Sequence, residues 1–154
     1  MPRYPEHLRA GSGDAYELRP DLHSRQHATG APGKDALAIL PDDQAGVHAI
    51  YKGAAPRDHD AGPVYSAGMH GSLAVPTGRV LVRLRDGLDA SSRRKEFAKA
   101  GYDIESTLSY APNAAWLRPT AGGVGAALNG MPALQAVPDV VHVEPQLLSH
   151  RQFK

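Results

Sequence analysis

The fold is decided by the stretch Gly78–Gln146, which reads GRVLVRLRDGLDASSRRKEFAKAGYDIESTLSYAPNAAWLRPTAGGVGAALNGMPALQAVPDVVHVEPQ. Strand-like and helix-like patterns follow one another here, with turn residues between them. The expected elements run in the order β-α-β-β-α-β and lie at Val80–Arg85, Asp89–Ala100, Asp103–Tyr110, Ala114–Arg118, Val124–Ala136 and Val140–Glu144. This order predicts an α+β fold, a ferredoxin-like βαββαβ two-layer sandwich whose helices both cover one face of a four-stranded antiparallel sheet.

Alternation along the strands predicts which side chains lie under the helices and which lie on the uncovered face. Those expected under the helices include Val80, Val82, Leu84, Ala115, Leu117, Val141 and Val143. Those expected on the uncovered face are Leu81, Arg83, Trp116, Arg118, Val140, His142 and Glu144. A tryptophan among aliphatic groups and arginines in the middle of an uncovered sheet indicates a protein-binding surface. The alternatives are that the N-terminal segment covers this face, or that a register slip turns Trp116 inward.

Capping residues set the expected helix ends. Asp89 is a candidate N-cap and Gly101 a candidate residue after the first helix. Gly130 and Pro132 interrupt the second helical pattern, so two short pieces fit better than one continuous helix. The first helix carries several basic residues, which we interpret as a solvated face because no aromatic stacking platform accompanies them.

Three segments follow from these patterns. Residues 1–72 are interrupted by Gly and Pro, which predicts an irregular, partly disordered extension. One exception is a hairpin in which Ala36–Leu40 pairs with Val47–Tyr51, and which would need to dock on other structure. Residues 73–146 form the expected ferredoxin-like domain, and residues 147–154 form an extended C-terminal tail.

Composition narrows the function classes. The 154 residues include 17 basic and 16 acidic side chains, for a net charge of +1, so we expect neither a nucleic-acid nor a membrane partner. The absence of cysteine excludes disulfides and thiol chemistry. No signal-peptide-like run begins the sequence, so we expect a cytoplasmic protein, with export by a non-classical route as the alternative.

Catalytic and metal-binding motifs are weak. The run His70-Gly71-Ser72 faintly resembles a subtilase histidine motif but lacks its partner motifs. The run Gly78-Arg79-Val80 resembles the phosphate loop of acylphosphatases, yet it enters the first strand instead of following it. His23 and His27, with Asp58-His59-Asp60, offer metal ligands, but two histidines in a flexible segment seldom make a closed site. We therefore expect that the protein is not an enzyme and that it binds neither a metal ion nor a cofactor.

Several runs resemble the propeptides of subtilisin-like serine proteases, which also form the I9 family of peptidase inhibitors. They are Gly78–Gly87, Gly101–Ile104 and above all Leu134–Pro145, with its closing Pro-Asp-Val-x-x-Val-Glu-Pro pattern. The resemblance covers residues 78–152. It implies a domain that assists the folding of its protease and then inhibits it, in cis as part of a precursor or in trans, with the uncovered sheet face packed on two helices of the enzyme.

The resemblance also implies roles for particular residues. Glu144 matches a carboxylate that caps a helix of the protease, where backbone N–H groups and the helix dipole favour an anion. Gln146 stands where a second capping acid is common. The tail matches a segment bound like a product in the substrate cleft, and comprises Leu147, Leu148, Ser149, His150, Arg151, Gln152, Phe153 and Lys154. Gln152 lies near the family's scission position, and Arg151 with Lys154 would suit acidic specificity pockets.

A second function class stays open. A regulatory or assembly module could use the same sheet face to dimerise or to bind a protein that is not a protease. The two hypotheses differ at the tail. Its deletion should abolish protease inhibition under the first and leave association intact under the second.

Overall fold

The structure is a computed structural model that describes residues 3–10, 14–27, 34–42, 46–56, 61–68 and 71–149. The chain divides into two compact units. Unit 1 comprises Met1–Pro5 and Thr77–Gln146, and unit 2 comprises Glu6–Pro76 and Leu147–Lys154. Strands β8 and β11 each contribute residues to both units.

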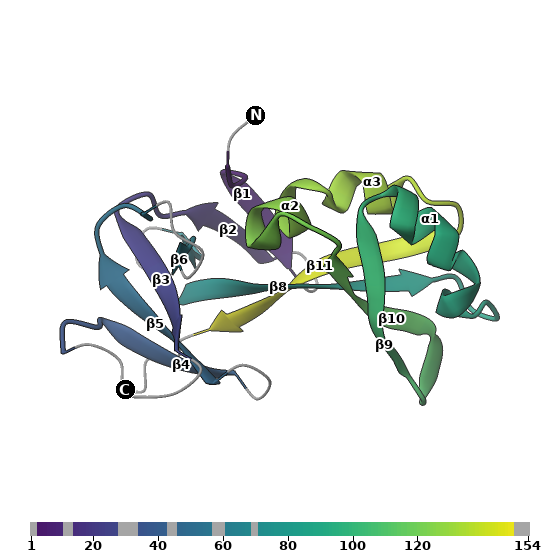
Figure 1. The fold of residues 1–154 in the computed structure, drawn as a ribbon, viewed down its shortest axis with the longest axis horizontal. Coiled ribbons are helices and arrows are strands. Elements are labelled where there is room, and N and C mark those ends of the chain that lie inside the picture. The colour runs from purple at the N-terminus through teal and green to yellow at the C-terminus, as the bar shows by residue number, and fades with distance from the viewer. Residues whose placement is uncertain are drawn as a thin grey trace. The chain divides into compact units, whose positions relative to one another are not determined.

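Unit 1 is built around the second part of β8. Its elements are β8 (Leu73–Leu84), η1 (Ala90–Arg93), α1 (Arg94–Lys99), β9 (Tyr102–Leu108), β10 (Ala111–Pro119), α2 (Gly123–Asn129), α3 (Met131–Gln135) and β11 (Val140–Ser149). Strand β8 pairs with β10 on one side and with β11 on the other, and β9 pairs with β10. Figure 1 shows α1, α2 and α3 gathered on one side of β8 and β11.

The core of unit 1 lies between these strands and the helices. Val80, Val82 and Leu84 of β8 alternate into it, and all three are fully buried. They pack with residues from η1, α1, β9, β10, α2, α3 and the turn before β11, namely Ala90, Phe97, Tyr102, Ala115, Leu117, Ala127, Leu134 and Val137. The two-residue period of β8 thus places every second side chain under the helices and leaves the others on the opposite face.

The helix ends follow their capping residues. The Asp89 side chain accepts a hydrogen bond from the Ser91 N–H at 3.0 Å and so caps η1 as predicted. Gly101, directly after the C-cap Ala100, has a φ of +95°, a conformation that favours glycine. The second helical pattern divides at Gly130 into α2 and α3, with Pro132 in the first turn of α3.

Unit 2 consists of strands. They are β1 (His7–Ala10), β2 (Asp14–Leu18), β3 (Leu22–His27), β4 (Ala38–Asp42), β5 (Gly46–Lys52), β6 (Ala61–Gly62) and β7 (Tyr65–Ser66), together with the start of β8 and the end of β11. The predicted hairpin is present, because β4 pairs with β5 in antiparallel register from Ala38↔Ile50 to Asp42↔Gly46. Strand β3 pairs with β5 and with β6. The hairpin therefore joins a larger sheet.

Unit 2 has its own apolar core. It joins β3, β4, β5 and β8 through Leu22, Ala38, Leu40, Ile50, Val64 and Val75. Leu73 and Leu148 are partly buried against this cluster. This packing supplies the docking that the β4–β5 hairpin needs, since an isolated hairpin is marginally stable in water.

The predicted fold class is wrong. Strands make up 52% of the chain and helices 17%, and the strands form two antiparallel sheets, not one ferredoxin-like sheet with an irregular extension. Across the described residues, one sheet has seven strands and the other has four. The helices and strands expected between Val80 and Glu144 are present, but β8 begins at Leu73 and β11 continues to Ser149. Residues 1–72, predicted to be irregular, contribute seven strands in their described part.

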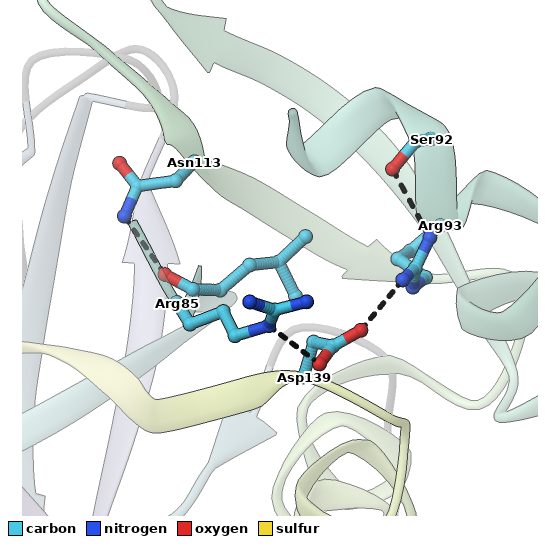
Figure 2. A network of polar contacts seen from close by, with 6 residues as sticks. Arg85, Ser92, Arg93, Asn113 and Asp139 are labelled. Carbon is cyan, nitrogen blue, oxygen red and sulfur yellow. Dashed lines mark hydrogen bonds and ion pairs between the residues drawn. The ribbon is translucent and has the colours of Figure 1, made fainter. Parts of the chain in front are cut away.

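A polar network fixes the turn that leads into β11. Asp139 has a φ of +70°, and its main-chain oxygen accepts a hydrogen bond from the Arg85 N–H at 2.9 Å. Its carboxylate accepts from Arg85 Nε at 2.8 Å and from Arg93 Nη2 at 2.7 Å (Figure 2). The two arginines lower the pKa of Asp139. One carboxylate thus connects the end of β8, η1 and the start of β11, which offsets the strain of a left-handed aspartate.

Tyr102 joins β9 to α2 through a buried hydrogen bond. Its side chain is 1% exposed, and its hydroxyl donates to the main-chain oxygen of Ala127. A Cβ added at Gly130 would lie 2.6 Å from this hydroxyl, so glycine leaves the space that the tyrosine fills. Burial raises the pKa of Tyr102 from 10.0 to about 12.

We expect Tyr102→Phe to lower the free energy of unfolding by about 1–2 kcal/mol, because the Ala127 carbonyl loses its donor inside the core. Tyr110→Phe is the matched control, since Tyr110 is 84% exposed. Urea unfolding of the two variants and the parent chain would measure the difference. Equal losses in both variants would contradict the buried hydrogen bond.

The same variant tests the pKa. The folded-state pKa of Tyr102 lies above the unfolded value, so its contribution to stability is complete below pH 10.0 and is lost as the pH rises through about 12. Unfolding measured across this range should show a smaller loss of stability for Tyr102→Phe than for the parent chain.

Candidate interaction surface

The face of the unit 1 sheet that lies opposite the helices is formed by alternate residues of β8, β10 and β11. In β8 these are Thr77, Arg79, Leu81 and Arg83, which alternate with the buried core valines. The antiparallel register places Trp116 of β10 directly across from Leu81. Trp116 and Leu81 are both partly exposed, so the indole does not lie beneath the helices. We name this face of the sheet the outer face. Its side chains are Thr77, Arg79, Leu81 and Arg83 of β8, Glu105 of β9, Trp116 and Arg118 of β10, and His142, Glu144 and Gln146 of β11.

Arg79 is the buried centre of the outer face. Only 7% of the residue is exposed, although it carries a charge. Its guanidinium carbon lies 4.6 Å from the centroid of the Trp116 ring, in cation–π geometry. Its Nε lies 2.8 Å from Glu105 Oε1, and its Nη1 donates to Gln146 Oε1 at 3.4 Å. Arg79 therefore contacts side chains from three other strands of unit 1.

Glu105 reaches the outer face because of a β-bulge in β9. Trp116 pairs with Ser106, but the next residue of β10, Leu117, pairs with Ile104, so Glu105 is an extra residue without a partner across the ladder. A bulge of this kind redirects a side chain. The two carboxylate oxygens of Glu105 form ion pairs with Arg79 and with Arg118. The carboxylate therefore balances one buried and one partly exposed arginine.

Strand β11 completes the outer face with His142, Glu144 and Gln146. His142 Nε2 lies 3.4 Å from Glu144 Oε2, and the two side chains are 39% and 24% exposed. Gln146 Oε1 accepts a 2.7 Å hydrogen bond from Thr77 Oγ1 as well as the longer one from Arg79. Gln146 thus uses its amide oxygen within the chain, whereas the Glu144 side chain is partly exposed.

The structure brings together most of the residues that the sequence predicted for this surface. Those on the outer face are Leu81, Arg83, Trp116, Arg118, His142 and Glu144. Val140, also predicted there, instead packs against the core of unit 1. Val141, predicted to face inward, is 62% exposed. The alternation of β11 was therefore misassigned at its start, which directly follows the left-handed Asp139.

Part of the predicted cleft-binding tail belongs to β11. Leu147, Leu148 and Ser149 continue the strand, and Leu148 is partly buried against the core of unit 2. His150, Arg151, Gln152, Phe153 and Lys154 lie outside the described residues. A segment free to enter another protein's cleft would therefore have to begin after Ser149.

Sequence reasoning missed Arg79 and Glu105 and assigned Gln146 no partner. The signal for Arg79 was available, since it shares the parity of Leu81 and Arg83 in β8. No comparable signal exists for Glu105, because its orientation depends on a bulge set by the pairing of β9 with β10.

His23 has other contacts, and His27, the second histidine considered as a metal ligand, has a side chain outside the description. The ring of His23 stacks on Tyr51 with centroids 5.6 Å apart, and His23 Nδ1 lies 3.0 Å from the Gly53 carbonyl oxygen. The side chain of His27 and residues 58–60 lie outside the description. Within the described part of the chain, no group of three or more His, Cys, Asp or Glu side chains could hold a metal ion.

None of the helices described is long and apolar enough to cross a membrane. No protein-family model matches the sequence, and comparisons with curated proteins and with solved structures gave no significant match. The geometry of the outer face is therefore the structural basis for a functional proposal.

We expect Glu105→Gln to lower the free energy of unfolding by about 2 kcal/mol, because it leaves the buried Arg79 without a counter-ion. Loss of a fully buried partner costs roughly 3–5 kcal/mol, and Glu105 is partly exposed. Glu17→Gln, at an exposed position of β2, is the control and should change stability by less than about 0.5 kcal/mol. Denaturant unfolding measures both, and equal effects would contradict the role of Glu105.

Proposed function

We propose that this chain binds a subtilisin-like serine protease through the outer face, assists the folding of that protease and inhibits it. The proposal rests on the sequence resemblance across residues 78–152 and on the chemistry of the outer face. Binding of this kind requires no catalytic group from the inhibitor. Affinity comes from packed side chains and, for a segment in the cleft, from main-chain hydrogen bonds.

The observation that carries the proposal is the pair of Trp116 and Leu81 on the side of the sheet away from the helices. Both side chains are partly exposed and are flanked by Arg83 and Arg118. Tryptophan and arginine are enriched among the residues that dominate binding energy at protein interfaces. The expected surroundings of the indole were aliphatic groups and arginines; Val140 packs against the core instead, and Arg79 lies over the ring, which favours a partner that offers hydrogen-bonding groups beside an apolar contact.

Glu144 supports the proposal in a second way. Its side chain is 24% exposed on the outer face and its carboxylate lies 3.4 Å from the imidazole of His142, and an anion at such a position is favoured by the dipole of a helix N-terminus. Gln146 is oriented toward Thr77 and Arg79. A single carboxylate, not a pair, is therefore proposed to cap a helix of the protease.

The tail takes a smaller part in this proposal than the sequence suggested. Leu147, Leu148 and Ser149 are part of β11, so the proposed cleft-binding segment is limited to residues 150–154. The same observation favours the second candidate function, a regulatory or assembly module. Such a module does not need a tail that enters a cleft, so it is compatible with residues 147–149 being held in β11. The two functions share the outer face and differ in what the last residues do.

Trp116→Ala should raise the inhibition constant against a subtilisin-like protease by roughly 30-fold, because truncation of a central aromatic contact typically costs about 2 kcal/mol. Tyr110→Ala is the matched control, an aromatic residue that is 84% exposed at the β9–β10 turn. Inhibition of subtilisin and of related proteases by the full chain would be measured, with circular dichroism to confirm folding. Equal constants for the two variants would exclude the outer face as the binding site.

Deletion of residues 150–154 separates the two functions. If the chain inhibits by placing its tail in the cleft, the truncated chain should still bind the protease but inhibit it at least 10-fold more weakly, since the main-chain hydrogen bonds in the cleft are lost. Unchanged inhibition would contradict a cleft-binding tail. Failure of the full chain to bind or slow any protease of this class would overturn the proposal in favour of the assembly module.

A further inference from the structure

We propose that Arg79 is a positioning residue for recognition, in that it holds Trp116 in its binding orientation before the partner arrives. This inference rests on the proposed function, because it assigns Trp116 to the interface. It concerns a residue that is itself 7% exposed and so presents little surface to any partner. Arg79 would therefore act through the indole.

A fully buried side chain typically touches roughly 6–12 other residues, and a partly exposed tryptophan on one face of a sheet has fewer neighbours to fix its side-chain angles. Across the ladders, the residues that face Trp116 are Leu81 on β8 and Ser106 on β9. Neither covers a ring face as a planar group can. The Arg79 guanidinium does, because its carbon lies 4.6 Å from the ring centroid. Stacking of a planar cation on an indole is both attractive and directional.

Arg79 can hold the ring only if it is itself held. Glu105 Oε1 lies 2.8 Å from its Nε, and Gln146 accepts from its Nη1 at 3.4 Å. Gln146 is fixed in turn by the 2.7 Å hydrogen bond from Thr77 Oγ1, and the Thr77 hydroxyl also accepts from the Arg79 main-chain N–H at 3.2 Å. The guanidinium is thus restrained by side chains from two other strands, through the ion pair with Glu105 of β9 and the hydrogen bond to Gln146 of β11.

The consequence for binding is preorganisation. A side chain that is ordered before association does not lose its rotational freedom on association, and each immobilised side chain otherwise weakens binding by roughly 2- to 10-fold. The covered ring face leaves the remaining indole surface as the part that a partner can contact. Arg83, four residues along the same strand, lies on the same face but is exposed, and its guanidinium does not lie over an aromatic ring of the described residues.

The test compares Arg79→Met, Arg79→Lys and the control Arg83→Met. Trp116 is the only tryptophan in the sequence, so its fluorescence anisotropy decay and its quenching by acrylamide report on this ring alone. We expect faster ring motion and stronger quenching in Arg79→Met, an intermediate effect in Arg79→Lys and none in Arg83→Met. Inhibition of subtilisin-like proteases should weaken by about 3- to 10-fold in Arg79→Met. If Arg79→Met does not fold, the double variant Arg79→Met/Glu105→Gln, in which the carboxylate that has lost one of its two arginines is neutralised, takes the place of Arg79→Met and is compared with Glu105→Gln alone.

A double-mutant cycle distinguishes positioning from a general structural role. In the Trp116→Ala background, Arg79→Met should cause no further loss of inhibition, because the ring through which it acts is gone. An equal loss in both backgrounds would overturn the inference, as would unchanged ring mobility in Arg79→Met. If the parent chain inhibits no protease, the proposed function fails by itself, and the fluorescence measurements still decide whether Arg79 fixes the ring.

Discussion

The outer face of unit 1 depends on one constraint, which is that the buried charge of Arg79 must be balanced. An unpaired guanidinium at this level of exposure would cost several kcal/mol. Its counter-ion, Glu105, is available only because a bulge in β9 turns that residue toward Arg79. Its other partner, Gln146, is available only if β11 lies beside β8 in the observed register. A shift of either strand by one residue would remove a partner, so the arginine selects one register for each.

Apolar alternation and capping chemistry predicted the local elements of unit 1 from the sequence. The burial of Val80, Val82 and Leu84 and the cap at Asp89 follow from short-range patterns, and the structure agrees with them. The break of the second helix at Gly130 follows from the same kind of signal. Such features depend on residues a few positions apart, which one sequence displays directly.

The same reasoning failed where structure depends on distant partners. Strands β1, β2 and β3 are short, rich in polar residues and separated by glycine and proline, so no segment of them resembles a strand when considered alone. They form because each pairs with another segment, as β3 does with β5, about 25 residues further along the chain. The bulge at Glu105 belongs to the same class. The predicted fold class was therefore wrong, although most of the helices and strands predicted for the second half of the chain are present.

The buried ion pair, the exposed arginines and the apolar side chains of the outer face would affect different aspects of binding. Arg79 and Glu105 are largely buried, so salt screens their interaction little and a partner that covers them adds little desolvation cost. Arg83 and Arg118 remain at the margin, where charges influence the rate and orientation of encounter more than the final affinity. The indole and Leu81 lie between these two groups. Since the Arg79 guanidinium is already ion-paired with Glu105, a protein that docks here can bury the ring without leaving Arg79 without a counter-ion, and the removal of apolar surface from water can then favour binding.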